Sequence, residues 1–384
     1  MKINKFLFTT LAAITFFTSC ESDDDFMIDQ EEQEEEIIDP EPEEEEEPVE
    51  EEEEEPAGAY ANGVFILNEG NFGAGNSTVS FLNAEMDGVT NNIYAEVNSD
   101  ALLGDTGQSI AFYEEYAFIV MNVSNTIEVV NKNTFESVAT ISEGLQNPRY
   151  IAFANGNAYV TNWGDGSNAE DDYIAVINTE SFEVTENIAV VEGPEAIVEN
   201  EGNLYVAHLG GYSFNDKISV ISATDNTVSE TITVGDRPNS LEIEDGFLWI
   251  STGGLPSYAE AETAGKIVKV DLISNEVVAE MEFTSTTDHP GNLDIEDDIV
   301  YYTLGKTVYS FSEDATALPE TAFAELSDVA SLYGFEVEGG VIYAASANAD
   351  FTGNGDLYLY STTDGSLLDS FEVGINPSGV YFND

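Results

Sequence analysis

The rarest functional side chains in this 384-residue chain are arginine, histidine and cysteine. There are two arginines, Arg149 and Arg237, two histidines, His208 and His289, and one cysteine, Cys20. Arginine offers a planar set of N–H donors that suits carboxylate, phosphate or amide oxygens, and histidine can take up or release a proton near neutral pH. So few histidines and cysteines exclude a three-histidine metal centre, a cysteine-based metal site and an intramolecular disulfide.

The sequence contains none of the common catalytic signatures. It has no G-x-S-x-G elbow, no H-E-x-x-H pair and no P-loop. A lyase or hydrolase that uses His208 or His289 as acid or base is therefore the weakest of the functional alternatives. We expect a binding protein that is not an enzyme, with no cofactor and no metal. Calcium binding in the acidic loops, for example at Asp165 and Asp350, stays open, although their spacing does not fit an EF-hand.

A repeat of short strands must position these side chains. Residues 155–190 and 202–235 each contain three segments rich in Val, Ile or Tyr, bounded by Gly, Asn or Asp, which is typical of strands. One strand of every unit carries an aromatic residue that we expect in the core and not in a ligand site: Phe65, Phe118, Tyr159, Tyr205, Trp249, Tyr301 and Tyr343.

The spacing of these aromatic residues matches the length of a four-stranded propeller blade. We predict an all-β fold, a seven-bladed β-propeller with four-stranded antiparallel blades, over residues 57–384. A short helix over residues 257–266, inside a loop, is the one helical segment that the pattern allows.

The ends of the repeat region predict how the ring closes. The first unit begins at Gly63 with its second strand, so it lacks an innermost strand. Residues 375–382 follow the last complete unit and match the innermost strands that begin near Asn147 and Arg237. The C-terminal strand should therefore complete the first blade, which removes a free sheet edge.

In such a meander, the loop that enters each innermost strand and the loop between the second and third strands lie on one rim. Binding groups concentrate on loops that a rigid scaffold holds. We therefore predict a site for a sizeable, partly polar organic ligand on that rim. Its candidate residues are Arg149, Arg237, His208, His289, Trp163, Tyr150, Tyr212, Phe214, Tyr258, Tyr333, Asn239 and Asn292. The structural alternative is that the arginines only form ion pairs, the histidines stabilise turns and the aromatic rings pack on each other.

The N-terminus is predicted to be an export signal. Lys2 and Lys5 precede an apolar stretch over residues 6–17, which has the length of a signal-peptide core and is too short to span a bilayer stably. The stretch ends in small residues before Cys20, which resembles a lipobox. We predict a lipoprotein signal peptide over residues 1–19 and a lipid anchor on Cys20; an ordinary secretory signal is the alternative.

Residues 20–56 are predicted to be a disordered acidic tether. They are rich in Glu and contain four prolines, so they have little apolar surface to bury. The acidic residues directly after Cys20 resemble an export tag for surface lipoproteins, and we therefore expect the chain at the cell surface, in the outer membrane. The whole chain has 76 acidic and 9 basic residues. This charge excludes nucleic acid as a partner.

The segments NLYVAH (203–208) and ISVISATDNTVSETITVG (218–235), with the Asn-Pro and Arg-Pro turns, are similar to the YncE-like seven-bladed propellers over residues 57–384. With the lipobox, the export tag and residues 65–72, the chain resembles surface propeller lipoproteins that accompany outer-membrane transporters, such as the cobalamin-capturing BtuG type. The resemblance implies capture of a corrinoid, cobalamin above all, and its delivery to a TonB-dependent transporter barrel. Haem, a siderophore or a glycan would suit the rim nearly as well, and a protein-binding or adhesion module is the second alternative.

Overall fold

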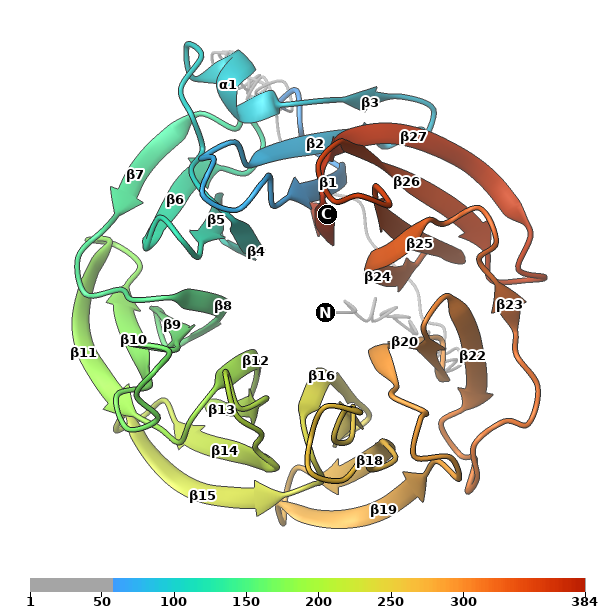
Figure 1. Ribbon diagram of the computed structural model, residues 1–384. Helices are drawn as coiled ribbons and strands as arrows, with labels where there is room; N and C mark the ends of the chain where they lie inside the picture. Colours follow the sequence, from blue (N-terminus) through green and yellow to red (C-terminus); the bar gives the residue numbers. More distant parts are fainter. Residues whose placement is uncertain (1–57, 384) are drawn as a thin grey trace, which may run out of the picture. The chain divides into compact units, whose positions relative to one another are not determined.

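Seven four-stranded antiparallel sheets surround a central axis in the computed structural model, which describes residues 58–383 (Figure 1). The predicted lipobox and acidic tether lie outside the described residues. We number the sheets as blades 1 to 7 along the chain. Each blade runs from an innermost strand at the axis to an outermost strand at the circumference.

The first four blades are, from the inside outward, β28 (Pro377–Asn383), β1 (Gly63–Asn68), β2 (Thr78–Asn83) and β3 (Val89–Thr90); β4 (Gly107–Tyr113), β5 (Tyr116–Met121), β6 (Thr126–Asn131) and β7 (Ser137–Ile141); β8 (Pro148–Ala154), β9 (Asn157–Asn162), β10 (Tyr173–Asn178) and β11 (Glu183–Ala189); β12 (Pro194–Asn200), β13 (Asn203–His208), β14 (Lys217–Ser222) and β15 (Thr227–Thr233).

The last three blades are β16 (Pro238–Glu244), β17 (Phe247–Thr252), β18 (Lys266–Asp271) and β19 (Glu276–Glu282); β20 (Gly291–Glu296), β21 (Ile299–Leu304), β22 (Thr307–Ser312) and β23 (Ala324–Glu325); β24 (Ser331–Glu338), β25 (Val341–Ala347), β26 (Asn354–Ser361) and β27 (Leu367–Ile375).

The ring closes as the sequence predicts. Strand β28 pairs antiparallel with β1, with Asn383 opposite Gly63 and Pro377 opposite Asn68. The C-terminus therefore ends beside β1 (Figure 1). Because β28 covers β1, the first blade has no open inner edge, which would otherwise be free to pair with another chain.

The core lies between neighbouring blades. The seven predicted core aromatics are all buried, with at most 6% of each residue exposed. One cluster, for example, joins Phe118 and Val129 of blade 2 to Val160 and Ile177 of blade 3. Each blade thus needs its neighbours to bury both faces, as expected for a repeat architecture.

The one helix among the described residues is not where the sequence pattern allowed it. Helix α1 (Ile93–Val97) lies between blades 1 and 2, and it forms where Ile93 and Tyr94 are buried in the apolar cluster of those blades. Residues 257–266 form no helix. There the N–H of Thr263 donates to the carbonyl of Leu255 at 3.1 Å, and the Thr263 hydroxyl accepts the Leu255 N–H at 2.8 Å, so the loop folds back on itself. None of the described residues forms a helix of the length and apolarity that a membrane crossing requires.

Candidate functional site

Loops from successive blades meet on one face of the ring. We call this face the mouth rim: the loops that enter the innermost strands and the loops between the second and third strands of each blade. Trp163 Nε1 donates to the carbonyl of Pro194 at 3.0 Å, from blade 3 to blade 4. His289 Nδ1 donates to the carbonyl of Gly253 at 2.7 Å, from blade 6 to blade 5, and Tyr333 bonds to blade 1. The predicted site residues thus lie on loops that contact one another.

Blades 1 to 5 build their entry to the innermost strand in the same way. The residue before the strand has a positive φ, and its carbonyl accepts an N–H from the loop after the second strand at 2.8 to 3.2 Å. The five residues are Asn376, Thr106, Asn147, Gly193 and Arg237. Glycine and asparagine tolerate this left-handed conformation best. This turn is therefore a structural element repeated in five blades. A residue other than glycine or asparagine at its positive-φ position adds backbone strain.

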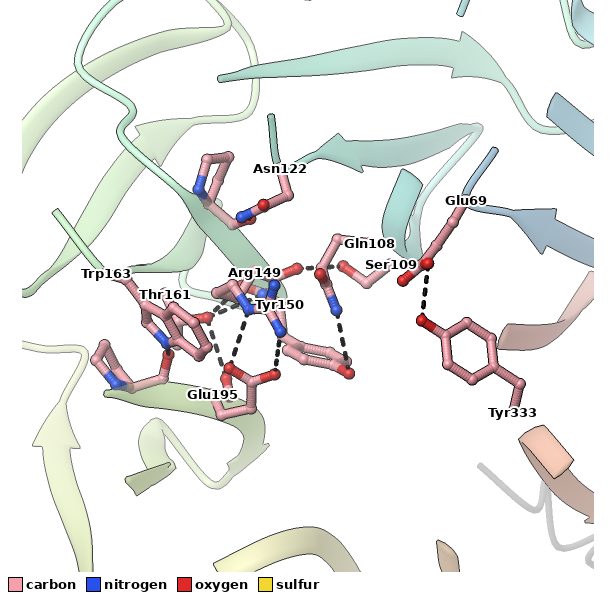
Figure 2. A network of polar contacts seen from close by, with 12 residues as sticks. Glu69, Gln108, Ser109, Asn122, Arg149, Tyr150, Thr161, Trp163, Glu195 and Tyr333 are labelled. Carbon is pink, nitrogen blue, oxygen red and sulfur yellow. Dashed lines mark hydrogen bonds and ion pairs between the residues drawn. The ribbon is translucent and has the colours of Figure 1, made fainter. Parts of the chain in front are cut away.

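Arg149 forms the centre of a polar network at the mouth rim (Figure 2). Its Nε and Nη2 donate to the two carboxylate oxygens of Glu195 at 3.0 and 2.6 Å. The guanidinium carbon lies 4.3 Å from the ring centroid of Trp163, a cation–π contact. The side chains of Arg149 and Glu195 are 17% and 8% exposed. The predicted structural alternative thus holds for Arg149, whose charge is satisfied within the protein.

Two tyrosines extend this network toward blade 1. Gln108 Nε2 donates to the hydroxyl of Tyr150 at 3.4 Å, and the hydroxyl of Tyr333 donates to Glu69 at 2.8 Å (Figure 2). Burial, with the nearby Glu195 charge, raises the pKa of Tyr150 to about 12. Burial also raises the pKa of the Glu69 carboxyl, although the bond from Tyr333 and the charge of Arg149 oppose the shift. Burial and the Glu69 charge raise the pKa of Tyr333 as well, so both tyrosines keep their protons at neutral pH, and the hydroxyl of Tyr333 donates to Glu69 while that of Tyr150 accepts from Gln108.

A second cluster joins the mouth loops of blades 5 and 6. Asn239 Nδ2 donates to the carbonyl of Pro290 at 2.8 Å, and Asn292 Nδ2 to the hydroxyl of Thr303 at 2.9 Å. Both ring nitrogens of His289 are engaged, one by Gly253 and the other by Glu262 at 3.2 Å. Asn239, Asn292 and His289 therefore act first as braces between loops.

His208 is placed away from any ligand. It is completely buried, and its Nε2 lies 2.8 Å from the hydroxyl of Ser219. Burial lowers the pKa of His208 to about 4, so the imidazole is neutral at pH 7. The same position of blades 1 and 3 holds the buried polar residues Asn68 and Asn162. His208 lies at the mouth-rim end of β13, but its side chain is buried inside blade 4. We therefore leave His208 out of the proposed ligand contacts.

The exposed aromatic residues gather on the mouth rim. Among the described residues, the Phe, Tyr and Trp side chains in the exposed class are Phe72, Tyr212, Phe214, Tyr258, Tyr333 and Phe351, and all six lie in mouth-rim loops or at the start of β24. Tyr212 and Tyr258 are 82% and 78% exposed. The ring centroids of Phe214 and Tyr258 are 6.0 Å apart, and those of Tyr333 and Phe351 5.8 Å. Solvent-exposed aromatic surface confined to one face is a mark of an interaction site.

The mouth rim is open, and its hollows among the described residues are shallow. Its largest hollow, about 420 Å³, is lined by Asp165, Gly166, Ser167 and Tyr212. Larger hollows of about 590 and 700 Å³ lie at the outer strands, but no exposed aromatic ring lines them. We favour the mouth rim because its exposed rings offer apolar area and its loops carry Arg237 as a donor.

Three carboxylates on successive innermost strands were not found from the sequence. Glu242, Asp294 and Glu336 each stand opposite the core aromatic of their blade, at equivalent positions of β16, β20 and β24. Burial raises the pKa of Glu336 well above its ordinary value, and the charges of Asp294 and Glu242 add to the shift. Burial and the charges of Asp294 and Glu244 raise the pKa of Glu242. Aligning the innermost strands by the core aromatics would have shown these acids in one layer.

The buried carboxyl of Glu336 should make the stability of the protein depend on pH. At pH values between the ordinary pKa of a glutamate and the raised pKa of Glu336, this carboxyl is protonated in the folded state and ionised in the unfolded state. The contribution of Glu336 to the free energy of unfolding therefore falls as the pH rises through this range. Glu336→Gln is neutral at every pH. We expect it to raise the melting temperature by a few degrees at pH 7 to 8, with the gain shrinking as the pH falls toward about 4.

Thermal unfolding followed by circular dichroism across this pH range checks the prediction. Glu276→Gln, on the exposed start of β19, is the matched control and should leave the melting temperature almost unchanged. An equal effect of both variants, or a Glu336→Gln gain that does not depend on pH, would contradict the raised pKa.

The family of the chain follows from its sequence profile over these blades. A family described as "Domain of unknown function (DUF5074)" matches residues 62–374, which cover blades 2 to 7 and most of blade 1. The chain belongs to the DUF5074 family. The finer resemblance to YncE-like and BtuG-type propellers stays a prediction, and the function of the DUF5074 chain is inferred from its site. No curated protein matches it in sequence.

Solved structures agree on the fold of this DUF5074 chain. A functionally unknown protein from Desulfotomaculum acetoxidans matches with a TM-score of 0.62 and 11% identity, covering 84% of this chain and 99% of that one. A putative 6-phosphogluconolactonase from Bacteroides fragilis matches with a TM-score of 0.59 and 15% identity, over 86% and 100%. BamB from Moraxella catarrhalis matches with a TM-score of 0.50 and 13% identity, over 85% and 89%. At these identities the likeness concerns the fold alone.

Proposed function

We propose that this protein is a lipid-anchored protein of the bacterial cell surface that captures an organic nutrient on its mouth rim. In this proposal it passes the ligand to a TonB-dependent transporter barrel in the outer membrane. The anchor and the location rest on the lipobox at Cys20 and on the acidic residues behind it. The proposed activity is binding and not catalysis, since His208 is buried and both ring nitrogens of His289 are engaged.

The observation that carries ligand capture is the confinement of exposed aromatic rings to the mouth rim. A large ligand with flat apolar faces and polar edges can stack on Tyr212 and Tyr258 and bond to the loops between them. An open rim suits such a ligand better than a small metabolite, which would need an enclosing pocket. A corrinoid such as cobalamin has this chemistry, with amides, a phosphodiester and large apolar faces, and it is our first candidate; haem, a siderophore or a glycan is the next.

A second candidate is a protein-binding or adhesion module that uses the same face. The openness of the rim favours it, because exposed rings around a shallow hollow of about 420 Å³ also fit a protein surface. Pull-down from detergent-solubilised outer membranes separates the two. A transporter barrel as the main partner supports nutrient capture, and a matrix or host protein supports adhesion.

The aromatic rings give the direct test of capture. We expect the double variant Tyr212→Ala/Tyr258→Ala to weaken cobalamin binding by at least about tenfold, because two exposed stacking surfaces are lost. The absorption spectrum of the protein after exposure to cobalamins and to haem, followed by calorimetry with the one retained, measures this. Ile273→Ala is the control, since Ile273 is 95% exposed but lies in the turn between β18 and β19, away from the mouth rim. If neither ligand is retained, the proposal of tetrapyrrole-like cargo is wrong.

A further inference from the structure

Arg237 differs from Arg149 in having no partner. Among the described residues no carboxylate lies within ion-pair distance of its guanidinium, and its side chain makes no hydrogen bond. The neighbouring Asp236 accepts a bond from the hydroxyl of Thr263 at 3.1 Å instead. In a chain with 76 acidic and 9 basic residues, carboxylates are abundant. The fold therefore places the Arg237 guanidinium away from the many carboxylates of this chain.

The backbone of Arg237 also carries a cost. Its φ is 57°, at the entry position where blades 1 to 4 have Asn376, Thr106, Asn147 and Gly193. A long side chain gains nothing from this conformation, which residues other than glycine and asparagine adopt at a cost in backbone strain. Asparagine would make the same turn with less strain. The turn therefore does not require an arginine at this position, and Thr106 makes the same turn in blade 2.

The surroundings of Arg237 indicate what it would bind. Its N–H donates to the carbonyl of Asn215 at 2.7 Å, directly after Phe214, whose ring faces Tyr258. The guanidinium lies close to Gly253 of the next mouth-rim loop, where an added Cβ would be 3.9 Å from Arg237 Nη1, an ordinary contact distance. An unpaired, forked donor on a turn that is bonded to the loop of Phe214 suits an oxyanion attached to a flat apolar group.

The geometry points to Arg237 as the subsite of the mouth rim that recognises an anionic group, a phosphate or a carboxylate, on the captured ligand. Arg149 has no such role, because Glu195 already neutralises it. This inference rests on the proposed capture function and assigns the charge of the ligand to one place between blades 4 and 5.

The two arginines make a direct experiment possible. Since the chain has only Arg149 and Arg237, the ¹⁵N-labelled full-length protein gives one Nε–H side-chain signal for each. We expect phenyl phosphate or benzoate to shift the Arg237 signal in a saturable way and to leave the Arg149 signal unmoved. Benzyl alcohol, which has the ring without the charge, should shift neither. Comparing phenyl phosphate with benzoate and with inorganic phosphate tells which oxyanion is preferred and whether the ring contributes.

Arg237→Asn assigns the signals and tests the role of the side chain. Asparagine occupies the same turn in blades 1 and 3, so this variant should melt at the same or a higher temperature. We expect it to bind the preferred probe at least about tenfold more weakly, and Arg237→Lys to retain part of the affinity. Unchanged probe binding in a folded Arg237→Asn variant, or equal shifts of both arginine signals, would overturn the subsite. Failure of cobalamin and haem to bind would overturn only the proposed cargo, since the probes report on Arg237 independently.

Discussion

Arg149→Ala is expected to lower the free energy of unfolding by about 3–5 kcal/mol, the largest effect of any single substitution discussed for this protein. The substitution leaves the Glu195 carboxylate, whose side chain is 8% exposed, without its two guanidinium bonds. A buried charge that has lost its partner costs far more than the intact pair contributes, because it can no longer be solvated or neutralised by a donor. Chemical denaturation monitored by fluorescence gives the free energy directly.

The control for this prediction is an ion pair of similar length at the surface. Lys266 Nζ lies 3.0 Å from Glu280, and these side chains are 26% and 44% exposed. Lys266→Ala should therefore change the free energy of unfolding by no more than about 1 kcal/mol. In the double variant Arg149→Met/Glu195→Gln, which removes both charges, we expect part of the lost stability to return. An Arg149→Ala protein as stable as the Lys266→Ala protein would mean that Glu195 finds water in the folded state.

Deleting residues 376–384 is expected to abolish cooperative folding. The deletion removes β28, which pairs with β1 along its length and buries Val380 at 2% exposure. Strand β1 would then have an open edge, and the apolar cluster shared by blades 1 and 7 would lose one side. The loss should exceed the total stability of a domain, about 5–15 kcal/mol. Size-exclusion chromatography and thermal circular dichroism should show aggregation and no melting transition.

A relocated copy of the strand distinguishes loss of the strand from general damage. The Asn383 amide donates to the carbonyl of Tyr60 at 2.9 Å, so the end of β28 lies next to the beginning of the described chain. Inserting residues 376–383 directly before Gly58 in the deleted chain should therefore restore blade 1 and a single melting transition. If the deleted chain already folds and stays monomeric, ring closure is not what holds blade 1.

Sequence reasoning succeeded where the signal was local and repeated. Alternating apolar residues, turn residues and one aromatic residue per unit define the blades, and the incomplete first unit together with the surplus last strand defines the closure. These features depend on the strand period and on turn chemistry, which act within a few residues of the chain. The same reasoning placed the loops of the mouth rim on one face, because the order of strands in a meander leaves no other arrangement.

Only the tertiary structure decided what each candidate side chain does. Arg149 and Arg237 both adjoin a proline, but Pro148 and Pro238 are the equivalent residues, so Arg149 lies in the strand and Arg237 in the turn before it. Arg149 therefore meets Glu195 from the neighbouring blade, and Arg237 meets no carboxylate. Likewise His208 became a buried residue, and Glu242, Asp294 and Glu336 became neighbours. Contacts between blades join residues that lie far apart in the sequence, such as Trp163 with Pro194 and Arg149 with Glu195, and the sequence of one repeat contains no information on which side chain the next blade presents.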